Sequence, residues 1–132
     1  MSTIINAINT LPEMVSVGGA SEIMITDAEL QLRLNFAEEY RDYLAEFGAV
    51  AARGIELTGI IDAEYYNVVS ATKQEWELNP KIPHSMYVVE KTGVDGIIIW
   101  QDTQGLIYQS SPNVKPKQIA ESLTEYILNR TK

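Results

Sequence analysis

The spacing of apolar residues changes after Gly54 from that of helices to that of strands, and this change decides the fold class. Before Gly54, apolar residues recur at the 3.6-residue spacing of amphipathic helices. After it, residues 55–60 alternate between apolar and polar, as in a strand with one buried face. Helices followed by consecutive strands with short turns are typical of an α+β domain with an antiparallel sheet.

Two apolar stripes predict helices in the first third of the chain. One covers residues 2–11, with Ile4, Ile8 and Leu11 at helical spacing. The other ends before Gly48, which can adopt the positive φ of a helix C-cap. Its apolar residues are mostly aromatic, as expected for a helix packed on a core: Phe36, Tyr40, Tyr43, Leu44 and Phe47.

A further helix between these two has two possible beginnings. Thr26 and Glu29 have the spacing of a capping box, in which each side chain bonds the backbone N–H of the other residue. A start at Ser21 is the alternative. It would place three apolar residues on one face: Ile25, Ala28 and Leu32.

Five strands are predicted after Gly54, over residues 55–60, 68–71, 86–90, 96–101 and 106–110. The fourth is apolar on both faces, so we expect it in the middle of the sheet, with Trp100 in the core. A capping box at Thr72 predicts a short inserted helix that Asn79 and Pro80 end. Asp102 to Gly105 forms a predicted tight turn. Pro116 is predicted to open a closing helix with one apolar stripe: Ile119, Leu123, Tyr126 and Ile127.

These elements predict one α+β domain over residues 1–132, with an antiparallel β-sheet of about five strands. N-terminal helices, one short inserted helix and a C-terminal helix pack against the sheet. Residues 1–18 are expected to be a helix and loop that either pack on the core or stay loosely attached.

Composition excludes several kinds of site and partner. Cysteine is absent and His84 is the single histidine, which excludes disulfides, thiolate chemistry and any site with two imidazoles. The formal net charge of −8 argues against nucleic acid and anionic membranes, and it fits either a basic protein partner or a need for solubility alone. Neither a secretory signal nor a membrane span is recognisable, so the cytoplasm is the expected location.

No catalytic residue, cofactor site or metal site is predicted. The carboxylate pairs Asp62/Glu64 and Asp95/Asp102 could perform acid–base chemistry, but each pair lies in or beside a predicted turn, where Asp usually bonds its own backbone. His84 lies in a connection with no neighbouring nucleophile, so we expect an exposed loop residue. The expected protein is therefore not an enzyme.

A surface for another protein is predicted around residues 62–66. Tyr65 and Tyr66 would point to opposite sides of an extended chain, so one should face solvent if the other is packed. Trp76 could extend this patch, or it could pack the short helix onto the sheet. Tyrosine and tryptophan are frequent in binding hot spots, and acidic rims attract basic partners. The candidate partner-binding residues are Asp62, Glu64, Tyr65, Tyr66, Trp76 and Glu77.

Several segments in order resemble the SUKH superfamily, which comprises bacterial toxin-immunity proteins and a fungal cell-wall assembly regulator. Residues 40–49 resemble the family's Tyr-x-x-Phe-Leu-x-x-Tyr/Phe-Gly-Gly/Ala helix end, and residues 54–60 its Gly-x-x-Leu-x-Gly-Leu strand. Residues 102–108 are similar to its Asp-x-x-Gly-x-Val turn, and residues 119–128 to its closing helix. The sequence departs from the family where Phe36-Ala37 replaces Leu-Pro and Leu123 replaces a common phenylalanine.

The resemblance implies an α+β fold and binding rather than catalysis. It implies an immunity protein that binds and neutralises a cognate secreted polymorphic toxin inside the producing cell. A nuclease-type toxin is expected, because such toxins tend to be basic. A non-enzymatic regulatory or scaffold module like the fungal regulator is the alternative, and a small enzyme is the third interpretation. The sequence leaves the toxin, the binding face and the oligomeric state open.

Overall fold

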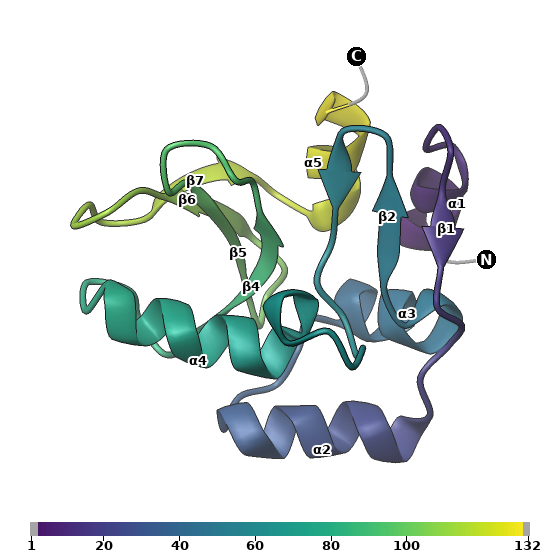
Figure 1. Cartoon of the computed structure of the whole chain (residues 1–132), viewed down its shortest axis with the longest axis horizontal. Coiled ribbons are helices and arrows are strands. Elements are labelled where there is room, and N and C mark those ends of the chain that lie inside the picture. Colours follow the sequence, from purple (N-terminus) through teal and green to yellow (C-terminus); the bar gives the residue numbers. More distant parts are fainter. Residues whose placement is uncertain (1–2, 131–132) are drawn as a thin grey trace.

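A computed structural model describes residues 3–130 (Figure 1), and this part of the chain combines helices with antiparallel strands, which confirms the α+β class. The helices are α1 (Thr3–Asn9), α2 (Glu22–Leu32), α3 (Glu38–Phe47), the 3-10 helix η1 (Glu64–Tyr66), α4 (Val68–Leu78) and α5 (Leu123–Arg130). The strands are β1 (Val15–Ser16), β2 (Val50–Ala52), β3 (Ile55–Glu56), β4 (Met86–Lys91), β5 (Ile98–Asp102), β6 (Ile107–Ser110) and β7 (Lys117–Ala120).

The strands form two antiparallel sheets, one of order β1-β2-β3 and one of order β4-β5-β6-β7. The sheets meet at a single bridge between Leu57 and Glu90, beside a 2.9 Å hydrogen bond from the Thr58 N–H to the Val89 carbonyl. β5 is an interior strand, as its continuous apolar run predicted. The sheet expected as one unit of about five strands is therefore divided at residues 57–58.

Both faces of β4 and β5 are covered, since these strands bury side chains at odd and even positions alike, whereas β7 is mostly exposed. Val88 and Trp100 belong to a small core with Ala71 of α4, which lies along one face of the curved sheet in Figure 1. Tyr87, Val89, Ile99 and Ile107 belong to the main core with the other helices. Trp100 is fully buried, as expected, and its indole N–H donates to Ser110 Oγ at 2.8 Å.

α1 lies against α3 and α5, and Ile4, Ile8 and Leu11 are buried there, as the helical spacing predicted. α2 begins after Ser21, whose hydroxyl accepts the Met24 N–H at 3.3 Å, so the alternative start is correct and the capping box at Thr26 is wrong. Glu29 instead binds the Phe36 N–H at 2.8 Å and pairs with Arg41.

The strand predicted over residues 68–71 is wrong, because these residues form the first turn of α4. Asn67 Oδ1 caps the helix by accepting the N–H groups of Val69 at 2.9 Å and Ser70 at 3.2 Å. Burial of Val68 and Ala71 outweighs the strand preference of the two valines. Thr72 lies inside the helix and accepts the Val88 N–H at 2.9 Å, so the capping box predicted there is also wrong.

The closing helix begins at Leu123 and not at Pro116, because residues 117–120 pair with β6 as β7. Ile119 is therefore an exposed strand residue and lies outside the apolar stripe. Ser122 caps the helix locally by accepting the Glu125 N–H at 3.0 Å. The carboxylate of Glu39 on α3 adds a distant cap, since it accepts the N–H groups of Leu123 and Thr124 and also binds the Gln101 amide. This cap is 84 residues distant in sequence from Leu123, and no local motif announces it.

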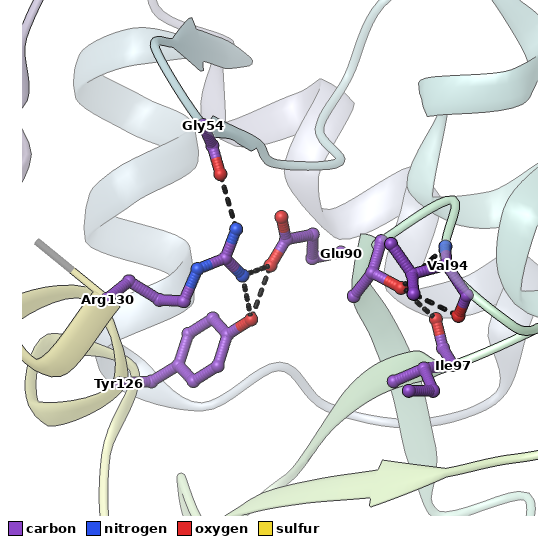
Figure 2. A network of polar contacts seen from close by, with 7 residues as sticks. Gly54, Glu90, Val94, Ile97, Tyr126 and Arg130 are labelled. Atoms are coloured by element: carbon purple, nitrogen blue, oxygen red, sulfur yellow. Dashed lines mark hydrogen bonds and ion pairs between the residues drawn. The ribbon is translucent and has the colours of Figure 1, made fainter.

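A buried ionic network joins α5, β4 and the β2–β3 turn (Figure 2). Glu90 is 3% exposed, and Arg130 Nη1 lies 2.6 Å from its Oε1. Tyr126 donates to the same carboxylate, and the Arg130 guanidinium also donates to the Gly54 carbonyl. Burial, reinforced by the charge of Glu90, raises the pKa of Tyr126. The last helix is thus held to both sheets by polar contacts.

The buried tyrosines of the main core predict unfolding in base. Tyr40, Tyr43 and Tyr87 are fully buried, and burial raises the pKa of each phenol above the ordinary 10.0. The unfolded chain ionises near pH 10 while the folded protein keeps these phenols neutral, so stability is complete below pH 10 and is lost above it. At about 1.4 kcal/mol per group and pH unit, the three together remove roughly 4 kcal/mol by pH 11.

We expect tyrosinate absorbance from these three side chains to appear in step with the loss of circular dichroism as the pH rises above about 10. Phenylalanine at Tyr40 removes one ionising group and should move the transition to higher pH. Ionisation of all tyrosines near pH 10 with intact circular dichroism would contradict this account.

Candidate protein-interaction site

A groove with a volume of about 850 Å³ lies beside η1 and α4. α4 turns its other side toward this hollow because it packs Val68, Ala71 and Thr72 inward. We call this hollow the Trp76 groove. Its lining comes from η1, α4 and the following loop: Glu64, Tyr65, Ser70, Lys73, Gln74, Trp76, Glu77 and His84.

Four of the six predicted partner-binding residues line this one groove: Glu64, Tyr65, Trp76 and Glu77. Asp62 lies instead in a neighbouring groove between α2 and η1. Tyr66 lines neither, because its hydroxyl bonds to Glu56. That these residues bind a partner stays a prediction, but the structure brings most of them onto one surface.

The two tyrosines are arranged by a 3-10 turn and not by an extended chain, so the alternation expected for a strand does not apply. Their rings meet edge to face with centroids 4.7 Å apart. Tyr65 is 50% exposed, whereas Tyr66 is half-buried. The bond to the Glu56 carboxylate, helped by burial, raises the pKa of Tyr66. Tyr65 is therefore the tyrosine that a partner can reach.

Tyr65 rests on a buried ammonium group. Lys91 Nζ lies 4.2 Å from the centroid of its ring, and the Lys91 side chain is only 5% exposed. The same nitrogen donates to Gln74 Oε1 at 3.1 Å and lies 3.7 Å from a Glu75 carboxylate oxygen. These contacts fix the ring without covering all of it. Sequence reasoning missed Lys91 because it reaches the site from β4.

Trp76 and His84 form a stacked pair, with ring centroids 4.1 Å apart and planes 11° from parallel. The Trp76 indole N–H donates to the Met86 carbonyl at 3.1 Å, so the ring is anchored to β4. The packing interpretation of Trp76 is therefore confirmed. The ring also lines the groove, and its part in binding a partner stays a prediction. His84 is exposed, as predicted, and its ring lies against Trp76 at the groove wall.

The charged groups around this surface are uncompensated. Within residues 3–130, neither a hydrogen bond nor an ion pair engages the carboxylates of Asp62, Glu64 and Glu77 or the Lys73 ammonium. Two carboxylates elsewhere are paired, that of Glu75 with Lys91 and that of Glu90 with Arg130. Three free carboxylates against one free ammonium leave this surface negative, which suits a basic partner.

The structure supports the turn interpretation of the carboxylate pair that includes Asp102. Its carboxylate accepts the N–H groups of Gln104 and Leu106, both at 3.0 Å. Across residues 3–130, no group of three or more histidine, aspartate or glutamate side chains is placed to hold a metal ion. Of the helices in the same range, none is long and apolar enough to cross a membrane.

Comparison with known proteins identifies the fold first. The chain is similar to a solved structure described as the crystal structure of a protein from Pseudomonas syringae pv. tomato. The TM-score is 0.76, and the alignment covers 98% of this chain and 96% of that one at 17% sequence identity. At this identity the likeness shows a shared fold. Among curated proteins, none matches the chain.

The family is shown by a match over the whole sequence. The model of SUKH_5, described as SMI1-KNR4 cell-wall, matches residues 1–132. The chain belongs to this SUKH family, which confirms the resemblance found in the sequence motifs.

Proposed function

We propose that this protein is an immunity protein, which binds a cognate secreted toxin inside the producing cell and neutralises it without catalysing a reaction. The match of the SUKH family over the whole chain is the observation that carries this proposal. The net charge of −8 and the free carboxylates of the Trp76 groove favour a basic partner, for which a nuclease-type toxin is the proposed class.

A regulatory interaction module is the second candidate, because the description of the matching family, SMI1-KNR4 cell-wall, refers to the cell wall. The two functions differ in their partners. An immunity protein binds one toxin tightly and protects the cell, whereas a regulatory module binds several proteins moderately and gives no protection.

Co-expression with the polypeptide encoded beside this chain tests the proposal. We expect that the neighbour alone stops growth, that this chain restores growth, and that the two purify together. Expression of an unrelated acidic protein of similar size is the control for a general effect of charge. A harmless neighbour that forms no complex would overturn the immunity function and favour the regulatory module.

Truncation of Tyr65 should weaken the complex without unfolding the protein. Tyr65→Ala removes the exposed ring of the groove, and loss of such an aromatic anchor costs about 2 kcal/mol, or roughly 30-fold in Kd. Leu30→Ala is the matched control, since Leu30 is also an exposed apolar residue but lies outside the Trp76 groove. Calorimetric titration measures both variants. Equal affinity of Tyr65→Ala and the wild type would remove Tyr65 from the interface.

A further inference from the structure

A second groove adjoins the Trp76 groove on the other side of η1. It has a volume of about 620 Å³ and lies between α2 and residues 60–70, which face each other across it. In Figure 1, α2 runs below η1 and the beginning of α4. Glu64 and Ser70 line both grooves, so the two hollows form one continuous surface. We call the second one the α2–η1 groove.

The α2–η1 groove offers apolar contact area. Met24 of α2 is 48% exposed on its wall, and the half-buried side chains of Ile60 and Val69 lie opposite. α2 already packs Ile25, Ala28 and Leu32 into the core, so Met24 is additional apolar surface of a helix whose core contacts are complete. Apolar surface in a hollow of this size is suited to the side chains of another chain.

The charged residues that line the same groove are all acidic, which favours a basic occupant. Asp27, Asp62 and Glu64 line it, and no lysine, arginine or histidine does so. Asp27 accepts a hydrogen bond from Gln31 at 2.7 Å on its own helix, which leaves its negative charge in place. Asp62 and Glu64 have no partner within residues 3–130. The hollow thus combines apolar walls with three uncompensated negative charges.

We propose that the α2–η1 groove binds a basic amphipathic segment of the partner protein. Its apolar side chains contact Met24, Ile60 and Val69, while its lysine or arginine groups pair with the carboxylates of Asp62 and Glu64. Long basic side chains suit this site because their aliphatic stems lie along apolar surface while the charged end reaches the rim. This inference rests on the proposed function, and it adds a place and a chemistry for part of the interface.

A defined peptide tests the groove without the toxin. The probe is a short synthetic helix with leucine on one face and lysine on the other, and the same residues in scrambled order form the control peptide. We expect amide shifts in the spectrum of the 15N-labelled full chain to centre on Met24, Ile60, Glu64 and Val69. The scrambled peptide should bind at least tenfold more weakly.

Matched variants separate a local site from general attraction by charge. The double variant Asp62→Asn/Glu64→Gln should bind the helical peptide at least tenfold more weakly than the wild type. Glu38→Gln with Asp42→Asn makes the same change in net charge on another groove, beside α3, and should change the affinity less than twofold. Equal effects of the two pairs, or shifts spread over α3 as well, would overturn the site. Concentration-dependent shifts at Met24 without peptide would show a second copy as the occupant and overturn it too.

The same two pairs of variants, measured against the neighbouring polypeptide, separate this inference from the proposed function. If the Asp62→Asn/Glu64→Gln variant binds the neighbouring polypeptide as tightly as the wild type and restores growth equally well, the proposed role of the groove is overturned. The immunity function would then still stand. Peptide binding at the groove with no complex to the neighbour would overturn the immunity function alone.

Discussion

Replacing Gly59 by alanine is expected to lower the free energy of unfolding by about 3 kcal/mol or more, among the largest effects of any single methyl group in this protein. A Cβ at this position would lie 1.9 Å from the Gly48 carbonyl oxygen and 2.8 Å from the Ala49 Cα. These are backbone atoms at the end of α3, so no side-chain rotation relieves the overlap.

The backbone around Gly59 cannot move away at low cost, because hydrogen bonds hold it on both sides. Its N–H donates to the Tyr66 carbonyl, its carbonyl accepts the Val68 N–H, and the Ile60 N–H donates to Gly48, each at 2.9 Å. A shift that admits the methyl group must break or lengthen these bonds, which also position η1 and the start of α4.

Urea unfolding followed by circular dichroism measures this effect. Gly93→Ala is the matched control, since Gly93 has open space around it and a positive φ of 73°, so its cost is only the backbone strain of about 1 kcal/mol. If Gly59→Ala proved no more destabilising than Gly93→Ala, the close approach of the two backbones would be refuted.

The second large effect is expected at Arg130. Arg130→Met leaves the Glu90 carboxylate buried on β4 without its countercharge, and breaking a buried ion pair in this way costs about 3–5 kcal/mol. Arg130 itself is 33% exposed, so solvent screens the pair and we expect about 2–3 kcal/mol. Loss of the bond to the Gly54 carbonyl adds to this effect.

Two further variants identify the cause of that loss. Adding Glu90→Gln to Arg130→Met removes the stranded charge and should recover a large part of the stability. Arg53→Met breaks the exposed pair with Glu13 and should leave the unfolding midpoint unchanged within error. If the losses of stability from Arg130→Met and Glu90→Gln simply add in the double variant, then packing of the Arg130 side chain, rather than the buried charge, determines the loss caused by Arg130→Met.

Elements with a long periodic pattern could be predicted from sequence, and elements fixed by distant contacts could not. The aromatic stripe of α3, the interior strand β5 and the turn at Asp102 follow from spacing and turn chemistry within a few residues. β1 and β2, of two and three residues, are too short to show a period. The valines that begin α4 favour a strand, and the one local signal for a helix there is Asn67, whose side chain caps it.

The candidate site also has a part that could be predicted from sequence and a part that could not. Tyr65 and Trp76 could be found because aromatic residues next to acidic ones are visible in the sequence. Their setting could not, because Lys91 and His84 reach the Trp76 groove from β4 and from the loop before it. The inward turn of Tyr66 also depends on Glu56, ten residues earlier in a different element.

The Glu39 cap of α5 also constrains the order in which the chain folds. An eight-residue helix is unstable by itself in water, and the N–H groups of Leu123 and Thr124 at its start bond to Glu39 on α3. The Gln101 amide that binds the same carboxylate belongs to β5, so this carboxylate joins α3, β5 and α5 in the folded protein. Closing a loop of this length is slow compared with local helix formation. We therefore expect α5 to dock late, after the central strands and α3 have come together.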